Sequence, residues 1–248
     1  MTSLWRLISA ERLKMSKSFV WLLTLLSPAI AVLPGMLSSP PDGESLSWQL
    51  QLSDMSMIHS MLFLPVLSGI FAALLCRYEH QEGGWKMLLA LPVTRMTVYL
   101  SKFIMIIVLL GVVQLLFGAA LLGVGWFREI TEPVPWALML RSVFGGWFAC
   151  LPLAALQLAV SQSWSSFGAP LALNVSLTLP NMLIANSATY GPYYPWVQPM
   201  LAMSPLSPYG DESFGAFNIS LESLLFVVLG SLIVFLAAGM ISFWRKAV

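Results

Sequence analysis

Six long apolar runs constrain the fold of this chain more than any other feature of its sequence. A helix needs about 20 mostly apolar residues to cross the hydrocarbon core of a bilayer, where only helices and closed barrels satisfy every backbone polar group. We therefore predict an all-α polytopic membrane protein, a single transmembrane domain over residues 1–248 with six transmembrane helices. The predicted spans are residues 18–37, 57–76, 99–124, 138–160, 167–185 and 224–243.

The composition supports a surface that faces lipid. Hydrophobic residues make up 58% of the chain and charged residues only 9%, whereas a soluble domain carries roughly 25% charged residues. The weakest runs are the fifth, which holds Asn174, Asn181 and two prolines, and the fourth, whose start is blurred by Arg141.

Basic residues are distributed unevenly around the six runs. Cytoplasmic loops of membrane proteins carry an excess of Lys and Arg. Ten of the 12 basic residues precede the first run, lie between the second and third, or follow the sixth: Arg6, Arg12, Lys14, Lys17, Arg77, Lys86, Arg95, Lys102, Arg245 and Lys246. These regions are therefore predicted to be cytoplasmic. This requires an even number of crossings and places both termini inside the cell.

The segment before the first run, residues 3–16, is predicted to be an amphipathic helix at the membrane interface. Leu4, Ile8 and Met15 fall on one side of such a helix, with Arg6 opposite them. The alternative is an ordinary charged tail that only orients the first span. On the other side of the membrane we expect two long outer loops, about 38–56 and 186–223, the second with Trp and Tyr at the headgroup level.

The inner segment 77–102 is the most structured connection that the sequence predicts. Adjacent glycines end the helix that leaves the second run, and Thr94 is a suitable N-cap for the next helix. Between them, Trp85, Leu88 and Leu89 repeat at the spacing of a short amphipathic helix. Such a helix is suited to docking in the groove of a partner protein. The alternative is an ordinary inner loop whose Trp85 lies on the headgroups.

Polar residues within the runs are candidates for a transport pathway: Gln114, Gln157, Asn174 and Asn181. The alternative is that they tie neighbouring helices together by hydrogen bonds. His59 and His80 are expected at opposite membrane interfaces, and Cys76 and Cys150 are expected to be small buried hydrophobes.

The sequence lacks the common catalytic and nucleotide-binding motifs. It contains no GxxxxGK[ST] loop, no HExxH and no GxSxG. We therefore expect a pathway, an anchor or a receptor without chemistry of its own, and not an enzyme. A membrane enzyme acting on lipid would need acids, bases or metal ligands gathered at one depth, and the sequence offers no such cluster.

Motifs around the first three runs resemble those of a known family. AERLK lies just before the first run, an E-x-x-x-G-x-W-K-x-L-L-x-x-P-V-x-R pattern follows the second, and a lysine opens the third. This order resembles the ABC-2 type permease subunits, and particularly their lantibiotic-immunity and bacitracin-resistance branch. The matching residues are Glu11, Lys14, Glu79, Gly83, Trp85, Lys86, Leu88, Leu89, Pro92, Val93, Arg95 and Lys102.

The resemblance implies a subunit of an ATP-driven exporter in a bacterial plasma membrane. Its partners would be an identical or sister permease and two copies of a separate ATPase, which would bind ATP and Mg²⁺, so that this chain would bind no cofactor. Its cargo would be an amphipathic antimicrobial peptide, expelled for immunity or resistance. The ATPase would be contacted through an elbow helix at the N-terminus and a coupling helix comprising Glu79, Glu82, Gly83, Gly84, Trp85, Lys86, Leu88 and Leu89.

Two other functions remain open at this point. One is a sensor or anchor subunit without transport. The other is a secondary transporter, which would usually place ionisable residues within its spans. Apart from Arg141 we expect none at mid-span.

Overall fold

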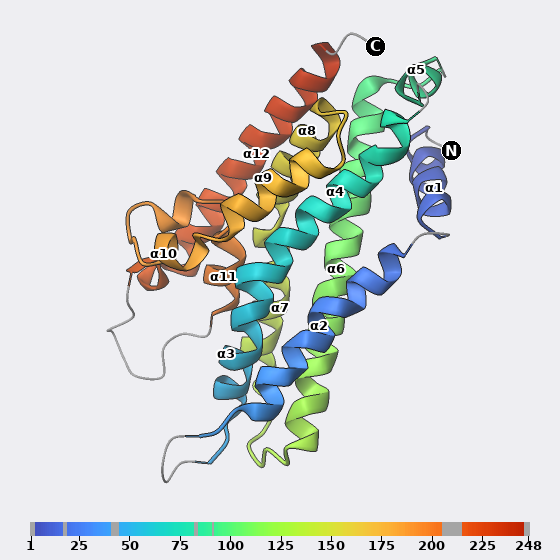
Figure 1. Ribbon diagram of the computed structural model, residues 1–248. Coiled ribbons are helices and arrows are strands. Elements are labelled where there is room, and N and C mark those ends of the chain that lie inside the picture. The colour runs from blue at the N-terminus through green and yellow to red at the C-terminus, as the bar shows by residue number, and fades with distance from the viewer. Residues whose placement is uncertain are drawn as a thin grey trace.

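The computed structural model describes residues 3–16, 19–40, 45–81, 84–90, 92–204 and 215–245. Within these ranges all regular structure is helical, and the long helices form an elongated bundle (Figure 1). Five helices in the described ranges are long and apolar enough to cross a membrane: Val20–Leu37, Trp48–His80, Arg95–Phe127, Trp136–Ser163 and Leu221–Arg245. The all-α membrane fold is thus confirmed, and five continuous candidate spans are found among the described residues.

The first, third and sixth predicted spans each correspond to one unbroken helix. These are α2 (Val20–Leu37), α6 (Arg95–Phe127) and α12 (Leu221–Arg245). The helix α6 begins at the predicted cap, because the Thr94 side chain accepts a hydrogen bond from the Thr97 backbone N–H at 3.2 Å. It therefore runs as one helix from Arg95 through the whole span.

The second span is longer than predicted, because the residues before it are also helical. It consists of α3 (Trp48–Ile58), the π-helix η1 (His59–Phe63) and α4 (Leu64–His80). The Ser47 side chain caps α3 by accepting from the Leu50 N–H at 3.2 Å. Trp48, Leu52 and Met55 are buried. The prediction of a loop over 38–56 is therefore wrong from Trp48 onward.

The fifth predicted span is interrupted. It forms α9 (Gly168–Thr178) and α10 (Asn181–Ala185), separated at Pro180. Proline lacks the N–H that would continue the ladder, and its ring disfavours helical geometry before it. The fourth span remains long enough to cross as α7 (Trp136–Ala149) followed directly by α8 (Leu151–Ser163).

The segment after α10 folds back into the molecule instead of lying outside as a loop. It contains η2 (Gly191–Tyr193) and α11 (Gln198–Met203), and a further turn, η3 (Gly215–Asn218), precedes α12. All six residues of α11 are buried, and it packs against α7. Trp196 is also buried, which corrects its predicted headgroup position, whereas Tyr190 and Tyr193 are exposed.

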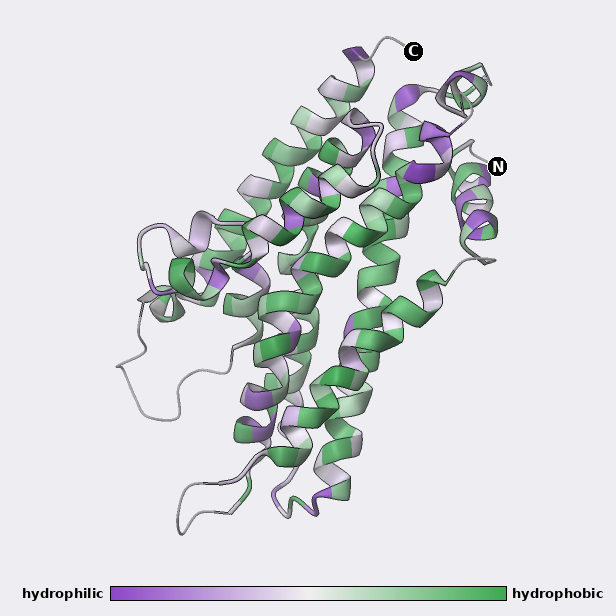
Figure 2. Cartoon of the chain, in the orientation of Figure 1, coloured by the Kyte–Doolittle hydropathy of each residue, from purple (hydrophilic) through white to green (hydrophobic). Residues whose placement is uncertain are grey.

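Both termini lie at one end of the bundle. Figure 1 places N, C and the short helix α5 (Gly84–Leu89) together there, with the connections after α2 and α6 at the opposite end. The N-terminal helix α1 (Ser3–Ser16) covers the predicted amphipathic range and packs against α6. In Figure 2 this end carries hydrophilic residues on α1, α5 and the end of α4, while the middle of the bundle is mostly hydrophobic.

Candidate functional site

A cluster of four charged side chains joins α1, α4 and α6 at the end where the termini lie. Each of two lysines contacts one oxygen of each of two carboxylates. Lys102 Nζ lies 3.0 Å from Glu11 Oε1 and 2.9 Å from Glu79 Oε1. Lys14 Nζ lies 3.2 Å and 2.6 Å from the same two atoms. The cluster is therefore a closed ring of alternating charges, drawn from three helices.

Three members of this ring are almost completely removed from solvent. Glu11, Glu79 and Lys102 are 2%, 4% and 1% exposed, whereas the Lys14 side chain is 34% exposed. Lys102 also donates to the Leu75 carbonyl at 2.7 Å. Burying a charge is costly unless it is paired and hydrogen-bonded. The cluster therefore fixes the positions of α1 and α4 against α6.

The short helix α5 is attached to this cluster through Trp85. The Lys102 ammonium lies 5.7 Å from the Trp85 ring centroid, a cation–π contact. Trp85 Nε1 donates to His80 Nδ1 at 3.2 Å, and its ring lies 5.1 Å from that of Phe243 on α12. Because His80 Nδ1 accepts this bond, its Nε2 donates to the Ser161 carbonyl of α8 at 2.8 Å.

The close approach of α5 to α4 depends on Gly84. A Cβ at this position would lie 2.9 Å from both the Glu79 Cα and the Tyr78 carbonyl oxygen, which are backbone atoms and cannot move aside. The glycine predicted as a hinge thus lets the two helices touch. A second attachment lies nearby, where Arg95 Nη1 donates to the carbonyls of Phe243 and Trp244 at 3.2 and 3.0 Å.

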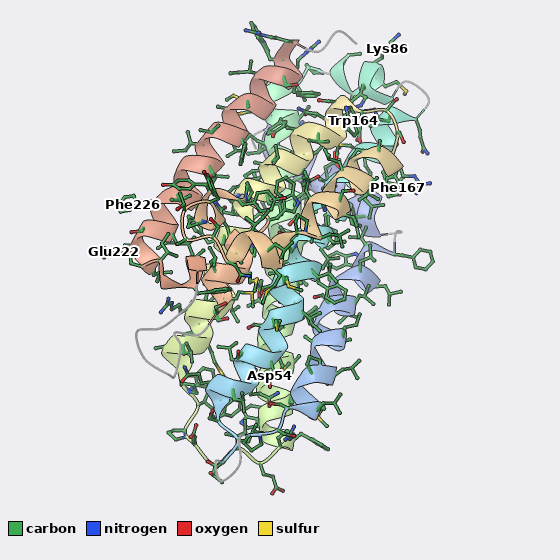
Figure 3. All side chains as sticks on the ribbon, turned by 60° about the vertical axis from the view of Figure 1, so that its left-hand side comes forward. Asp54, Lys86, Trp164, Phe167, Glu222 and Phe226 are labelled. Atoms are coloured by element: carbon green, nitrogen blue, oxygen red, sulfur yellow. The ribbon has the colours of Figure 1, made fainter. Side chains whose placement is uncertain are left out.

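The predicted docking residues divide between the interior and the surface. Trp85 is buried and Leu88 packs against the core, so the expectation that Trp85 reaches into a partner's groove is corrected. Lys86 and Met87 are exposed, and Figure 3 shows Lys86 at the outer end of the molecule. Glu82, Gly83 and the side chain of Leu89 lie outside the described residues.

Three of the four predicted pathway residues form hydrogen bonds between helices. Asn174 Oδ1 accepts from Gln157 Nε2 and from Trp196 Nε1, both at 2.8 Å, while its Nδ2 donates to the Pro65 carbonyl at 2.9 Å. Asn181 Nδ2 donates to the Met61 carbonyl at 2.7 Å. In a regular α-helix the carbonyl of Met61 would accept from the N–H of the residue four positions later. That residue is Pro65, which has no N–H, so Asn181 supplies the donor instead.

Gln114 lies apart from the other three residues. It is buried between α6 and α11, where its Nε2 contacts Met203 Sδ at 3.2 Å. His59 is also fully buried, which corrects its predicted place at an interface. Its Nδ1 lies 2.6 Å from Ser27 Oγ, and its ring stacks on Phe117 at 4.2 Å. A pathway lined by the four predicted residues stays a prediction.

Sequence reasoning did not bring the charged ring together, although it named all of its members. Glu11 and Lys14 share a helix face at i and i+3, but nothing in the spacing shows that Glu79 and Lys102 meet them. Cys76 and Cys150 are buried, as predicted. Among the described residues no group of three or more His, Cys, Asp or Glu side chains could hold a metal ion.

The apolar spans, with buried polar side chains that form hydrogen bonds between them, define a polytopic helical membrane protein. Residues 7–181, more than half of the chain, match the sequence profile described as ABC-2 family transporter protein, and the chain belongs to this family. No curated protein matches the chain. Members of this family are membrane subunits of ABC transporters, typically not catalytic themselves, and they generally work with an ATPase partner.

Proposed function

We propose that this chain is the membrane-spanning subunit of an ATP-driven exporter, and that α5 receives the force of a separate ATPase. One observation carries the proposal: Trp85 of α5 is packed on Lys102, which is paired with Glu11 of α1 and Glu79 of α4. A displacement of α5 is therefore passed to three other helices through buried contacts. ATP and Mg²⁺ belong to the partner chain in this proposal.

The surface that α5 offers to the ATPase is small and defined. Met87 is 74% exposed and Lys86 is exposed beside it. An unbranched methionine adapts to an apolar pocket, and a flanking cation complements acidic groups around it. Because Trp85 holds α5 from inside, these outward side chains can be changed without removing the anchor.

A matched pair of exposed methionines tests the docking surface. The chain would be co-expressed with an ABC ATPase from the same organism, and the ATPase that co-purifies would be measured. Met87→Asp should lower the recovered ATPase at least about tenfold, since a buried unpaired carboxylate costs more than 1.4 kcal/mol. Met96→Asp, at an exposed site on α6 near the same end, should leave it unchanged. Equal recovery with both variants would refute docking through α5.

We propose six crossings with both termini in the cytoplasm, the interrupted pair α9–α10 forming the fifth. Both termini share one end of the bundle in Figure 1, which agrees with an even number of crossings. Tyr190, 73% exposed beyond α10, is then outside, and Met87 is inside. In intact cells a membrane-impermeant maleimide should label Tyr190→Cys and not Met87→Cys. Labelling of Met87→Cys alone would refute this arrangement.

For the cargo we propose an amphipathic antimicrobial peptide, expelled from a bacterial plasma membrane by this permease paired with an identical or sister chain. The motif resemblance around Glu11, Glu79 and Lys102 supports this assignment. Cells that express the complete complex should tolerate a lantibiotic better than cells whose ATPase carries a substituted lysine in its GxxxxGK[ST] loop. Equal tolerance in the two strains would favour a non-transporting sensor or anchor instead.

A further inference from the structure

A cavity with both apolar and polar lining residues opens between the ends of α4 and α8 and the start of α9, apart from the charged ring. Its volume is about 320 Å³, within the range of about 300–1,000 Å³ that is typical of small-molecule sites. The side chains relevant to its chemistry are Arg77, Gln81, Ser161, Ser165, Ser166 and Phe167. No carboxylate lines this cavity among the described residues.

The charge at this cavity is positive. The Arg77 guanidinium carbon lies 5.5 Å from the centroid of the Phe167 ring, and Arg77 makes no ion pair within the described part of the chain. Phe167 and Pro170 place the first turn of α9 at the cavity wall, and α9 has no side-chain cap. A helix N-terminus attracts anions through its free N–H groups and its dipole. Pro170 has no N–H, so Gly168 and Ala169 supply the free N–H groups of this turn. Both features favour a negatively charged ligand.

A buried hydroxyl at the same wall lacks a partner. Ser161 is 2% exposed, and its Oγ has no hydrogen-bond partner among the described residues. Its backbone carbonyl is already used by His80. The Oγ atom itself is shielded from solvent, so its side chain must turn toward the cavity to meet a ligand. Because a buried polar group without a hydrogen bond is costly, a ligand that accepts from the turned hydroxyl would be stabilised. Ser165 and Ser166 add two more hydroxyl donors at the rim.

The surroundings favour a phosphoryl group that belongs to a lipid. Trp164 and Phe167 are exposed on the connection between α8 and α9 (Figure 3), as aromatic residues commonly are at the headgroup level. From there exposed apolar side chains follow on α9, at the break after it and on α10: Ala172, Val175, Leu179 and Leu183. The part of this row on α9 gives an acyl chain an apolar surface that starts one turn from the cavity, and the row resumes on α10 after the break at Pro180.

We propose that this cavity binds the phosphoryl headgroup of an anionic phospholipid from the cytoplasmic leaflet. Arg77 pairs with the phosphate oxygens, for which guanidinium geometry is well suited. The first turn of α9 and the Ser161 hydroxyl complete the donor set, and the acyl chains lie along the outer face of α9. Basic pockets between transmembrane helices are a recognised form of lipid site. This inference does not depend on the ATPase.

The test is a lipid titration of the purified full-length chain in detergent, followed by native mass spectrometry. Wild type should retain phosphatidylglycerol in preference to phosphatidylcholine. Arg77→Gln should weaken retention about tenfold, and Ser161→Ala about threefold, as for losing one charged and one neutral hydrogen-bond donor. Arg12→Gln removes an exposed charge from the same end and should change retention less than twofold. Thermal unfolding of each variant shows that it is folded.

The outcomes separate the lipid from a free anion. Preferential retention that falls in Arg77→Gln and in Ser161→Ala, and not in Arg12→Gln, supports the proposal. Equal retention by wild type and both cavity variants overturns it. Inorganic phosphate should neither stabilise the protein nor displace phosphatidylglycerol. If phosphate alone gives the same stabilisation through Arg77, the cavity is a site for a free phosphoryl anion and the lipid assignment fails.

Discussion

Replacing Lys102 by methionine tests the charged ring most directly. The substitution keeps an unbranched apolar side chain, one atom shorter, and removes the ammonium that pairs with Glu11 and Glu79 and donates to the Leu75 carbonyl. Two buried carboxylates then share only Lys14. Removing one partner of a buried ion pair destabilises a protein by about 3–5 kcal/mol. At about 2–4 °C per kcal/mol for a chain of this size, we expect the unfolding midpoint to fall by about 10 °C.

The assay is thermal unfolding of the purified chain in detergent, with Lys14→Met as the matched control. Lys14 contacts the same two carboxylate oxygens, but its side chain is 34% exposed. Because water can replace part of the contacts of a partly exposed ammonium, this variant should lose less than half of the stability that Lys102→Met loses.

A variant in which the buried members of the ring are neutral shows whether the stability depends on the charges of the ring or on its packing. The triple variant Glu11→Gln, Glu79→Gln, Lys102→Met carries no unpaired buried charge, and replacing a whole buried ion cluster is often nearly neutral. It should recover at least half of the stability that Lys102→Met loses. Equal losses for the two lysine variants, or no recovery in the triple variant, would show that the ring does not hold the helices through its charges.

Three further outcomes follow from the packing. Gly125→Ala places a Cβ against the Trp48 ring and should destabilise by about 1–3 kcal/mol, whereas Gly123→Ala on the same helix meets open space and should stabilise by about 0.5–1 kcal/mol. Both are measured by SDS titration in mixed micelles. Asn174→Ala, which leaves buried donors of two neighbouring segments unpaired, should cost about 2–3 kcal/mol by the same measurement. The two cysteines should resist maleimide in the folded protein and react after denaturation in SDS; labelling of the folded protein would contradict their burial.

Much of the fold follows from apolar length alone, because a helix that faces lipid must satisfy its own backbone. This reasoning found α2, α6 and α12 nearly to their ends. It failed over Trp48–Ser56 because Gln51, Ser53 and Asp54 lower the apolar content of a stretch that is helical for another reason: its Trp48 and Leu52 pack inside the bundle. Tertiary burial is not visible in a hydropathy pattern.

The interruption at Pro180 and the return of α11 into the bundle were missed for a related reason. Hydropathy treats residues 167–185 as one span, but Pro180 ends α9 and Asn181 satisfies a carbonyl that Pro65 leaves free on another helix. The hydrogen bond from Asn181 to Met61 joins residues 120 positions apart, and no pattern in the nearby sequence indicates it. The same holds for the charged ring, whose members the motif named individually while their meeting depends on how α1, α4 and α6 pack.

The charged ring also determines when, during synthesis of the protein, the N-terminal helix α1 can take its final position. Glu11 leaves the ribosome first, Glu79 enters with α4, and Lys102 emerges last, at the start of α6. Until then the two carboxylates have only Lys14 to share. The N-terminal helix α1 therefore reaches its final position only after the third long helix, α6, has begun to insert. A nascent chain that stops before residue 102 would hold α1 loosely, exposed to proteases and quality control.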